Sequence, residues 1–287
     1  MRLGLLHPGA MGVTVGAAAQ AAGHEVLWLS TGRSAQTCAR AEKAGLQVCT
    51  DLPTLVGSVA GMLSVCPPEA ALSVAGEVMA AGFTGIYLDA NAVAPATSRR
   101  IQSLVESAPG PAGGAVYVDG GLIGPPALQP GTTRLYLSGA AAAEVSAWFT
   151  GSALDARLVE GPAGSASALK MCYAAYTKGA SALLLGVRAL AEAEGVSAAL
   201  LSEWALSQPD LGRRSEATAR GTAPKAWRFV AEMEEIARSF EDRRLPGGFH
   251  HAAAQIYSLM SELKDRDAVT LAVVLEALSR GADDVRG

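Results

Sequence analysis

The sequence predicts an α/β protein in which a doubly wound parallel sheet is followed by an all-α domain. Over the first half of the chain, short apolar runs alternate with segments of helical pattern, which is typical of βαβ units. From residue 163 onward the pattern is helical, and it starts with a run of about 30 residues, which is long for a globular helix. We therefore expect two domains, 1–160 and 161–287, with a long helix opening the second.

The expected elements of the sheet domain follow one another in regular order. Strands are expected at 3–6, 25–29, 61–65, 86–88, 115–118 and 133–138. Helices are expected at 11–22, 34–44, 68–81, 95–107 and 140–149. Parallel strands need connections of this length, so the spacing agrees with right-handed crossovers on a parallel sheet.

The second half begins after Gly161-Pro162, where a proline suits the start of a helix, and Gly195 suits the end of that helix. Helices are expected at 163–194, 198–207, 223–241, 250–264 and 268–280. The polar, glycine-bounded segment 210–220 is expected to be a loop. His250 and His251 are adjacent on a helix and point about 100° apart, so they do not chelate one ion together and no metal site is expected.

The composition argues against nucleic acid and membranes as binding partners, as the charge balance and the hydropathy indicate. The chain has 287 residues with 23 Lys and Arg against 27 Asp and Glu, so no basic field attracts nucleic acid or an anionic membrane. The apolar stretch 179–187 lies between Lys178 and Arg188 and is far shorter than the roughly 20 residues that a bilayer requires. The four cysteines form no C-x-x-C pair and no secretory signal opens the chain, so we expect a cytoplasmic protein with a small-molecule substrate.

The first strand runs into HPGAMG, an incomplete version of the G-x-G-x-x-G fingerprint that holds a dinucleotide pyrophosphate at a helix start. The second and third glycines are present, and a histidine before a proline replaces the first. We expect a dinucleotide-binding Rossmann domain here, and a tight turn without a ligand is the alternative. The expected cofactor contacts are His7, Pro8, Gly9, Ala10, Met11 and Gly12.

The end of the second strand carries STGRS, where an NAD-binding protein usually has an acidic residue for the ribose. A cation with hydroxyls and no carboxylate suits a 2′-phosphate, so NADP is expected over NAD; a merely solvated Arg33 is the alternative. The further residues expected at the cofactor are Ser30, Thr31, Arg33, Ser34, Val65 and Pro67.

Four segments together resemble the β-hydroxyacid dehydrogenase superfamily, which includes 6-phosphogluconate dehydrogenase, hydroxyisobutyrate dehydrogenase and imine reductases. HPGAMG is similar to its G-L-G-x-M-G opening, LDANAVAP (88–95) to its D-x-S-T-x-x-P, VDGGLIGP (118–125) to its D-A-P-V-S-G-G substrate loop, and GPAGSASALK (161–170) to its G-x-x-G-x-G-x-x-x-K. The helical remainder resembles a short C-terminal domain of unknown function found in bacterial members.

The resemblance implies that Lys170 is the general acid/base of an NADP-dependent oxidoreductase acting on a small hydroxy or carbonyl compound. Tyr173 and Asn91 stand where the family has an asparagine and a serine, and they are expected to be catalytic. Helical spacing places Ser167, Tyr173 and Thr177 on the face of Lys170. The expected substrate contacts are Gly120, Gly121, Leu122, Ile123, Gly124, Ser167 and Thr177.

Other interpretations stay open at this point. An imine reductase keeps the fold, although members with that activity usually lack the lysine. A non-catalytic NADP-binding sensor is suggested by His7, Tyr173 and the altered substrate loop, and fold alone does not choose among these functions. The resemblance also implies a homodimer through the helical domain, and whether His250 or His251 reaches the active site is left open.

Overall fold

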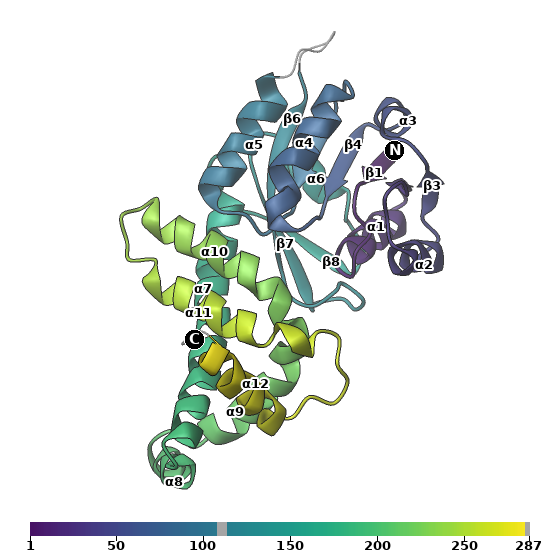
Figure 1. Ribbon diagram of the computed structural model, residues 1–287. Coiled ribbons are helices and arrows are strands. Elements are labelled where there is room, and N and C mark those ends of the chain that lie inside the picture. The colour runs from purple at the N-terminus through teal and green to yellow at the C-terminus, as the bar shows by residue number, and fades with distance from the viewer. Residues whose placement is uncertain (108–113, 285–287) are drawn as a thin grey trace. The chain divides into compact units, whose positions relative to one another are not determined.

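The computed structural model describes residues 1–107 and 114–284 (Figure 1). The chain separates into two compact units, Met1–Met171 and Cys172–Gly287. The division falls inside α7 (Ser165–Ala193), so a single helix contributes residues to both units. The domains 1–160 and 161–287 stay a prediction.

One eight-stranded sheet forms the centre of the first unit, in the order β3-β2-β1-β4-β5-β6-β7-β8. All neighbouring strands are parallel except β6 and β7. The strand order reverses between β1 and β4, and α/β proteins bind ligands outside the carboxyl ends of the strands at such a switch point. The predicted fold class is confirmed. The strands are β1 (Arg2–Leu5), β2 (Glu25–Leu29), β3 (Gln47–Cys49), β4 (Gly61–Ser64), β5 (Ile86–Asp89), β6 (Val116–Ile123), β7 (Thr133–Ser138) and β8 (Leu154–Leu158).

Helices cover both faces of this sheet, as doubly wound connections require. One apolar core includes residues of α1 (Gly12–Ala21), α2 (Ala35–Lys43) and α6 (Ala142–Ala147). The other core includes residues of α3 (Leu52–Ser58), α4 (Ala71–Ala80) and α5 (Pro95–Ser107). Figure 1 shows α4 and α5 lying side by side on the sheet.

Successive strand residues point to opposite cores, which explains why the strands read as unbroken apolar runs. Leu63 and Leu88 belong to the first core, whereas the residues before them, Met62 and Tyr87, belong to the second. Because both faces of a parallel strand are covered, both sets of side chains are apolar.

Several sequence expectations in this unit are wrong. The elements β3, β8 and α3 were not expected, and β3 and β8 are short edge strands in which four residues are exposed, Gln47, Val48, Arg157 and Leu158. The glycine-rich residues 120–123 form the second half of β6 and not a loop, and they pair with β7 in the antiparallel direction. Glycine is favoured there because β6 is closely covered: a Cβ on Gly120 would lie 2.9 Å from Leu88 Cδ1.

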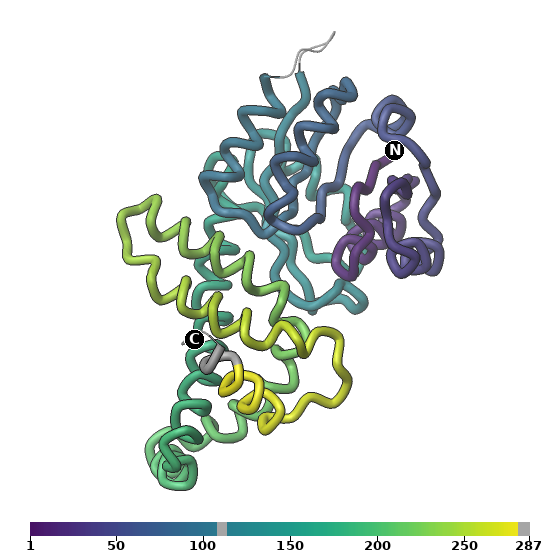
Figure 2. Tube along the Cα trace, in the orientation of Figure 1, coloured from purple at the N-terminus to yellow at the C-terminus, as the bar shows by residue number. Residues whose placement is uncertain are grey.

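The second unit is entirely helical in the residues that the structure describes. Figure 2 shows α10 and α11 running side by side as an antiparallel pair. The expected loop at 210–220 is wrong: it is a helix whose buried side consists of Ser215 and Ala219, while most of its charged residues face outward. The helices after α7 are α8 (Ser197–Ser207), α9 (Leu211–Thr222), α10 (Ala226–Glu241), α11 (Gly248–Leu259) and α12 (Leu271–Asp284).

Two kinds of feature are absent from the described residues. Among them, no helix combines the length and the apolar character that crossing a bilayer would need. Nor do residues 1–107 and 114–284 contain a group of three or more His, Cys, Asp or Glu side chains arranged to hold a metal ion.

Candidate functional site

The turn between β1 and α1 lies at the switch point of the sheet, and its two glycines face different surroundings. A Cβ on Gly12 would lie 2.1 Å from the carbonyl oxygen of His7, so only glycine lets the helix start this close to the strand. A Cβ on Gly9 would meet no protein atom within 4 Å. Gly9 therefore exposes its backbone to open space, as a residue that lies against a dinucleotide must.

The segment after β2 holds its hydroxyl residues through local hydrogen bonds. Ser34 is the N-cap of α2 and accepts a hydrogen bond from the Thr37 amide at 3.3 Å. Ser30 donates to the Cys49 carbonyl at 3.2 Å, and Thr31 donates to the Thr50 carbonyl. These bonds fix the loop from which Arg33 extends.

Arg33 and His7 come together at this end of the sheet. The Nε of Arg33 and the Nδ1 of His7 are buried and have no hydrogen-bond partner among the described residues. Burial, with the charge of Arg33 as a second cause, lowers the pKa of His7 to about 4. His7 is therefore neutral at pH 7, and the positive charge at this place comes from Arg33. The orphaned nitrogens, the open space at Gly9 and the helix start together fit a phosphate-bearing cofactor.

The carboxyl end of β4, on the other side of the switch point, is fixed by Asn91. The Asn91 side chain accepts a hydrogen bond from the Cys66 amide at 2.5 Å and donates one to Ser64 Oγ at 3.1 Å. It is 3% exposed, so it holds the segment of Val65 and Pro67 from beneath. The catalytic role expected for Asn91 stays a prediction, while the structure shows it positioning two expected cofactor contacts.

Lys170 lies on the second turn of α7, above the end of β6. Its Nζ donates a hydrogen bond to the carbonyl oxygen of Leu122 at 2.7 Å. Burial lowers the pKa of Lys170 to about 8, because the amine has no acidic partner to offset its lost hydration. The carboxyl ends of parallel strands share one edge of the sheet, so this amine lies on the same edge as the turn of His7.

Gly121 explains how α7 comes so close to β6. A Cβ at this position would lie 2.8 Å from the Ala166 carbonyl oxygen and 3.1 Å from Lys170 Cβ. Gly124 ends the strand with a φ of +129°, a conformation that L residues rarely adopt. The expected substrate contacts Gly120, Gly121, Leu122, Ile123 and Gly124 therefore form the strand end beneath Lys170, and their binding role stays a prediction.

The other polar residues expected on the Lys170 face of α7 have separate environments. Ser167 is 1% exposed and donates its hydroxyl proton to Asp119 Oδ1 at 2.5 Å. Thr177 donates to the carbonyl oxygen of Tyr173 at 3.0 Å, and Tyr173 is 47% exposed. Their expected place on the face of Lys170 and their substrate contacts stay predictions.

Two buried aspartates that sequence reasoning passed over stand side by side on β5 and β6. Asp119 is paired in register with Asp89, and both are 1% exposed. Burial, together with the charge of Asp119, raises the pKa of Asp89 to about 7 even though the Asn91 amide donates to it. Each is the aspartate of one of the motifs matched above and ends an apolar strand, where a charge is costly without partners, but neither was expected at the site.

The two histidines of α11 are engaged within the helical unit. His250 is 5% exposed and packs against the rings of Phe240 and Phe249. His251 is clamped by Glu234 at 2.9 Å and Glu241 at 2.8 Å, and these carboxylates raise the pKa of its imidazole.

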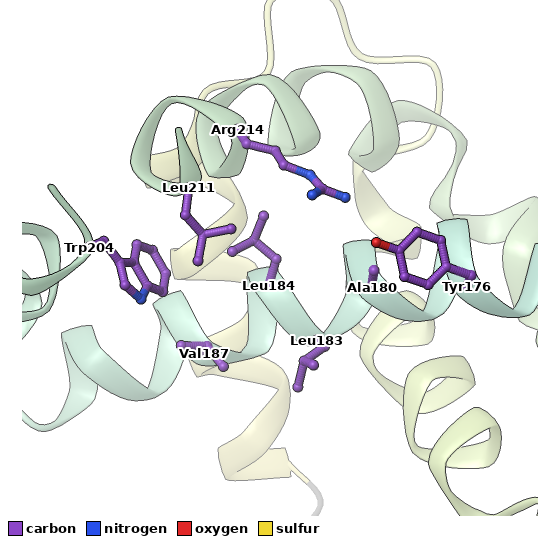
Figure 3. Close-up of a pocket in the computed structure, with 8 residues that line it drawn as sticks. All are labelled: Tyr176, Ala180, Leu183, Leu184, Val187, Trp204, Leu211 and Arg214. Atoms are coloured by element: carbon purple, nitrogen blue, oxygen red, sulfur yellow. The ribbon is translucent and has the colours of Figure 1, made fainter. Parts of the chain in front are cut away.

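A shallow apolar pocket lies on the outer side of α7 in the helical unit (Figure 3). The Arg214 side chain extends from α9 toward Tyr176, and Trp204 of α8 lies at the other end. The lining is apolar apart from the Arg214 guanidinium and the Tyr176 hydroxyl, so the pocket does not resemble an active site. Its residues are Tyr176, Ala180, Leu183, Leu184, Val187, Trp204, Leu211 and Arg214.

Comparisons with solved structures show the same fold over nearly the whole chain. A 3-hydroxyisobutyrate dehydrogenase of Mycobacterium tuberculosis, solved with L-serine, is 18% identical with a TM-score of 0.66, covering 96% of this chain and 98% of that one. One from Salmonella typhimurium is 14% identical with a TM-score of 0.69, covering 96% and 99%. A reductive aminase of Aspergillus terreus, solved with an NADPH-type cofactor, cyclohexanone and allyl amine, is 16% identical with a TM-score of 0.56, covering 98% and 99%.

Sequence comparisons match a smaller part of the chain than the structural comparisons do. No curated protein sequence matches the chain. Residues 191–260, which include α8, α9, α10 and α11, match the family described as Domain of unknown function (DUF1932). The resemblance inferred from the motifs is thus confirmed at the level of the fold: residues 191–260 match the DUF1932 model, and the chain shares its fold with the two 3-hydroxyisobutyrate dehydrogenases.

Proposed function

We propose that the protein is an NADP-dependent oxidoreductase that transfers a hydride between the nicotinamide and a small hydroxy or carbonyl compound, with Lys170 as general acid/base. The observation that carries this proposal is the Lys170 amine, whose pKa is lowered to about 8, on the sheet edge that also holds the phosphate-type turn. The fold shared with dehydrogenases and a reductive aminase supports a redox reaction.

The reaction needs a proton as well as a hydride. Bound NADP would accept the hydride from the substrate carbon, and NADPH would return it. In oxidation, the neutral Lys170 amine takes the proton that leaves the hydroxyl oxygen. In reduction, the ammonium form donates that proton back. An ordinary lysine with a pKa near 10.4 is almost entirely protonated at neutral pH, whereas a pKa of about 8 makes both forms available.

The carbonyl oxygen of Leu122 assists this exchange. It accepts a hydrogen bond from Lys170 Nζ at 2.7 Å and so directs one N–H away from the substrate. Because a carbonyl accepts from both protonation states of the amine, it holds Nζ in place throughout the cycle. The bound substrate oxygen then needs only one of the remaining positions on the nitrogen.

The preference for NADP rests on Arg33. Its guanidinium has a buried nitrogen without a partner and lies close enough to His7 to lower that pKa. A 2′-phosphate would satisfy these donors, whereas the unphosphorylated ribose of NAD would leave them unpaired.

An imine reductase is the second candidate, because the fold is also that of the reductive aminase from Aspergillus terreus. A lysine that delivers a proton serves reduction of an imine as well as of a carbonyl. A non-catalytic NADP sensor is the third, and for that function the lowered pKa of Lys170 has no use.

The test is a calorimetric titration of the full chain with NADPH and with NADH, followed by a spectrophotometric screen of hydroxyacids, aldehydes, ketones and imines. Tight NADPH binding with turnover of a hydroxy or carbonyl compound is the expected result. Turnover of imines alone would favour the second candidate, and binding without any turnover would favour the sensor.

We also propose that the protein forms a homodimer through its helical unit and works in a reducing cytoplasm. On α7, Tyr176, Leu183 and Leu190 recur every seven residues, with Tyr173 three residues before the first of them, and the four side chains Tyr173, Tyr176, Leu183 and Leu190 are 47%, 71%, 52% and 62% exposed. This is the spacing at which one helix packs on another, and the apolar pocket lies on the same face (Figure 3). The four cysteines are free, as a reducing compartment requires. Leu183→Glu should convert a dimer to a monomer in sedimentation velocity; a monomeric wild type would refute the dimer.

A further inference from the structure

We propose that Asp119 is a positioning residue for Lys170: by holding the first turn of α7 on β6, it sets where the amine lies. This inference rests on the proposed function of Lys170. It assigns Asp119 to the support of the site, although the motif around it resembles a substrate-binding segment.

Asp119 accepts five hydrogen bonds while being only 1% exposed. Its Oδ1 accepts from Ser98 Oγ at 3.0 Å and from Ser167 Oγ at 2.5 Å. Its Oδ2 accepts from Ser138 Oγ at 2.8 Å, from the Gly164 amide at 2.9 Å and from the Ser167 amide at 2.9 Å. A buried carboxylate with this many donors is held firmly in a single orientation.

Two of these donors are amides at the start of α7, which have no carbonyl partner in the preceding turn of the helix. A third amide, that of Ala166, donates to Ser138 Oγ at 3.0 Å, and Ser138 in turn donates to Asp119. The carboxylate also lies at the positive end of the helix macrodipole, where negative charge is stabilising. Asp119 therefore anchors the helix start to the sheet both directly and through Ser138.

The anchor and the amine join the same strand to the same helix. Asp119 and Leu122 lie three residues apart on β6, and their partners Ser167 and Lys170 lie three residues apart on α7. Between the two bonds, Gly121 lets the backbone of Ala166 and the Cβ of Lys170 approach the strand. The helix is thus attached to β6 at two points one turn apart, and loss of the first changes the placement of the second.

Polar groups of β5, β6 and α5 also lie near Asp119. Asp89 is its register neighbour on β5, and Tyr117 on β6 contacts Ser98 through its hydroxyl at 2.9 Å. Ser98 therefore serves Asp119 and Tyr117 together. Because the backbone amides donate only, a residue without an acceptor at position 119 leaves them unpaired.

Asp119→Asn is the informative variant. The asparagine oxygen still accepts from the Gly164 and Ser167 amides, and its nitrogen faces hydroxyls that are able to rotate and accept. The charge and one acceptor are lost while the volume is kept, so this variant is expected to fold. Ser167→Ala removes the 2.5 Å bond alone and serves as the second variant if Asp119→Asn fails to fold.

The experiment measures the Lys170 amine directly and needs no substrate. The full chain is reductively methylated with formaldehyde and cyanoborohydride between pH 6.5 and 10.5, and methylation of each lysine is followed by peptide mass spectrometry. Lys43, Lys225 and Lys264 are internal references within the same sample. Asp51→Asn is the matched control, because Asp51 also caps a helix, accepting from the Thr54 amide at 2.8 Å, but lies on α3.

We expect the apparent pKa of Lys170 to be near 8 in the wild type and in Asp51→Asn, and to rise by at least one unit in Asp119→Asn and Ser167→Ala. An unchanged Lys170 profile in the folded variants would overturn the positioning role while leaving the proposed function intact. A wild-type Lys170 that titrates like the reference lysines would instead count against the proposed function, so the two failures are distinguishable.

Discussion

Lys170 Nζ and the carbonyl oxygen of Leu122 are joined by a hydrogen bond of 2.7 Å that links α7 to the end of β6. The carbonyl replaces only part of the hydration that the buried amine loses. Among the described residues no carboxylate is bonded to the amine to replace the rest, so burial lowers the pKa of Lys170 to about 8. The buried amine therefore costs folding free energy, and under the proposed function the same placement serves proton transfer.

Replacing Lys170 should separate activity from stability. Lys170→Met should abolish turnover and leave NADPH affinity nearly unchanged, and at pH 7 it should raise the free energy of unfolding by roughly 1–3 kcal/mol. The amine is depressed from about 10.5 to about 8, so the wild type is stabilised as pH rises through that window and the advantage of Lys170→Met shrinks there. Chemical denaturation at pH 7 and pH 10 measures this. Equal stability differences at both pH values would contradict the lowered pKa.

Replacing Arg33 should change the choice of cofactor. Arg33→Ser should weaken NADPH binding by roughly 10- to 100-fold, the value of a charge-assisted hydrogen bond, and should leave NADH binding almost unchanged. Arg100→Ser is the control, because it removes the same charge from an exposed position on α5 of the same unit. Calorimetric titration of both variants with both cofactors gives the ratio. A ratio that shifts equally in both variants would mean that Arg33 acts only through overall charge.

The sequence predicted helices and strands correctly where a local pattern determines the secondary structure. The bounds of α5 and β7 were predicted to the residue, because a proline starts the helix and alternating β-formers fill the strand. The structure of residues 120–123 was predicted wrongly because glycine is needed there for the close packing of α7 on β6. This contact joins residues far apart in the chain, so no local pattern reveals it. Lys170 was singled out through its motif, and its catalytic role stays a prediction. Asp119 was not singled out, because its donors come from residues 98, 138, 164 and 167 and meet only in the folded chain.

His7 should contribute to acid sensitivity. Its pKa is about 4 in the folded chain and 6.5 is its ordinary value, so the unfolded chain binds a proton in this window and the folded chain does not. Stability that is complete above about pH 6.5 is lost as pH falls toward 4. His7→Asn should therefore lose less stability than the wild type between pH 7 and pH 5, as followed by thermal unfolding, with His24→Asn as the control for loss of a histidine elsewhere in the same unit. Parallel losses in all three proteins would show that His7 is not the group involved.

Gly9 should matter for the cofactor and not for the fold. A Cβ there meets no protein atom within 4 Å and the backbone φ is not positive, so Gly9→Ala should fold with the stability of the wild type. If the pyrophosphate lies against this backbone, the added methyl should weaken NADPH binding by tenfold or more. Gly57→Ala is the matched control, because its Cβ also meets open space but lies on α3. Thermal unfolding without ligand and titration with NADPH separate the two effects. Wild-type NADPH affinity in Gly9→Ala would place the cofactor elsewhere, because two atoms cannot occupy the volume that the methyl fills.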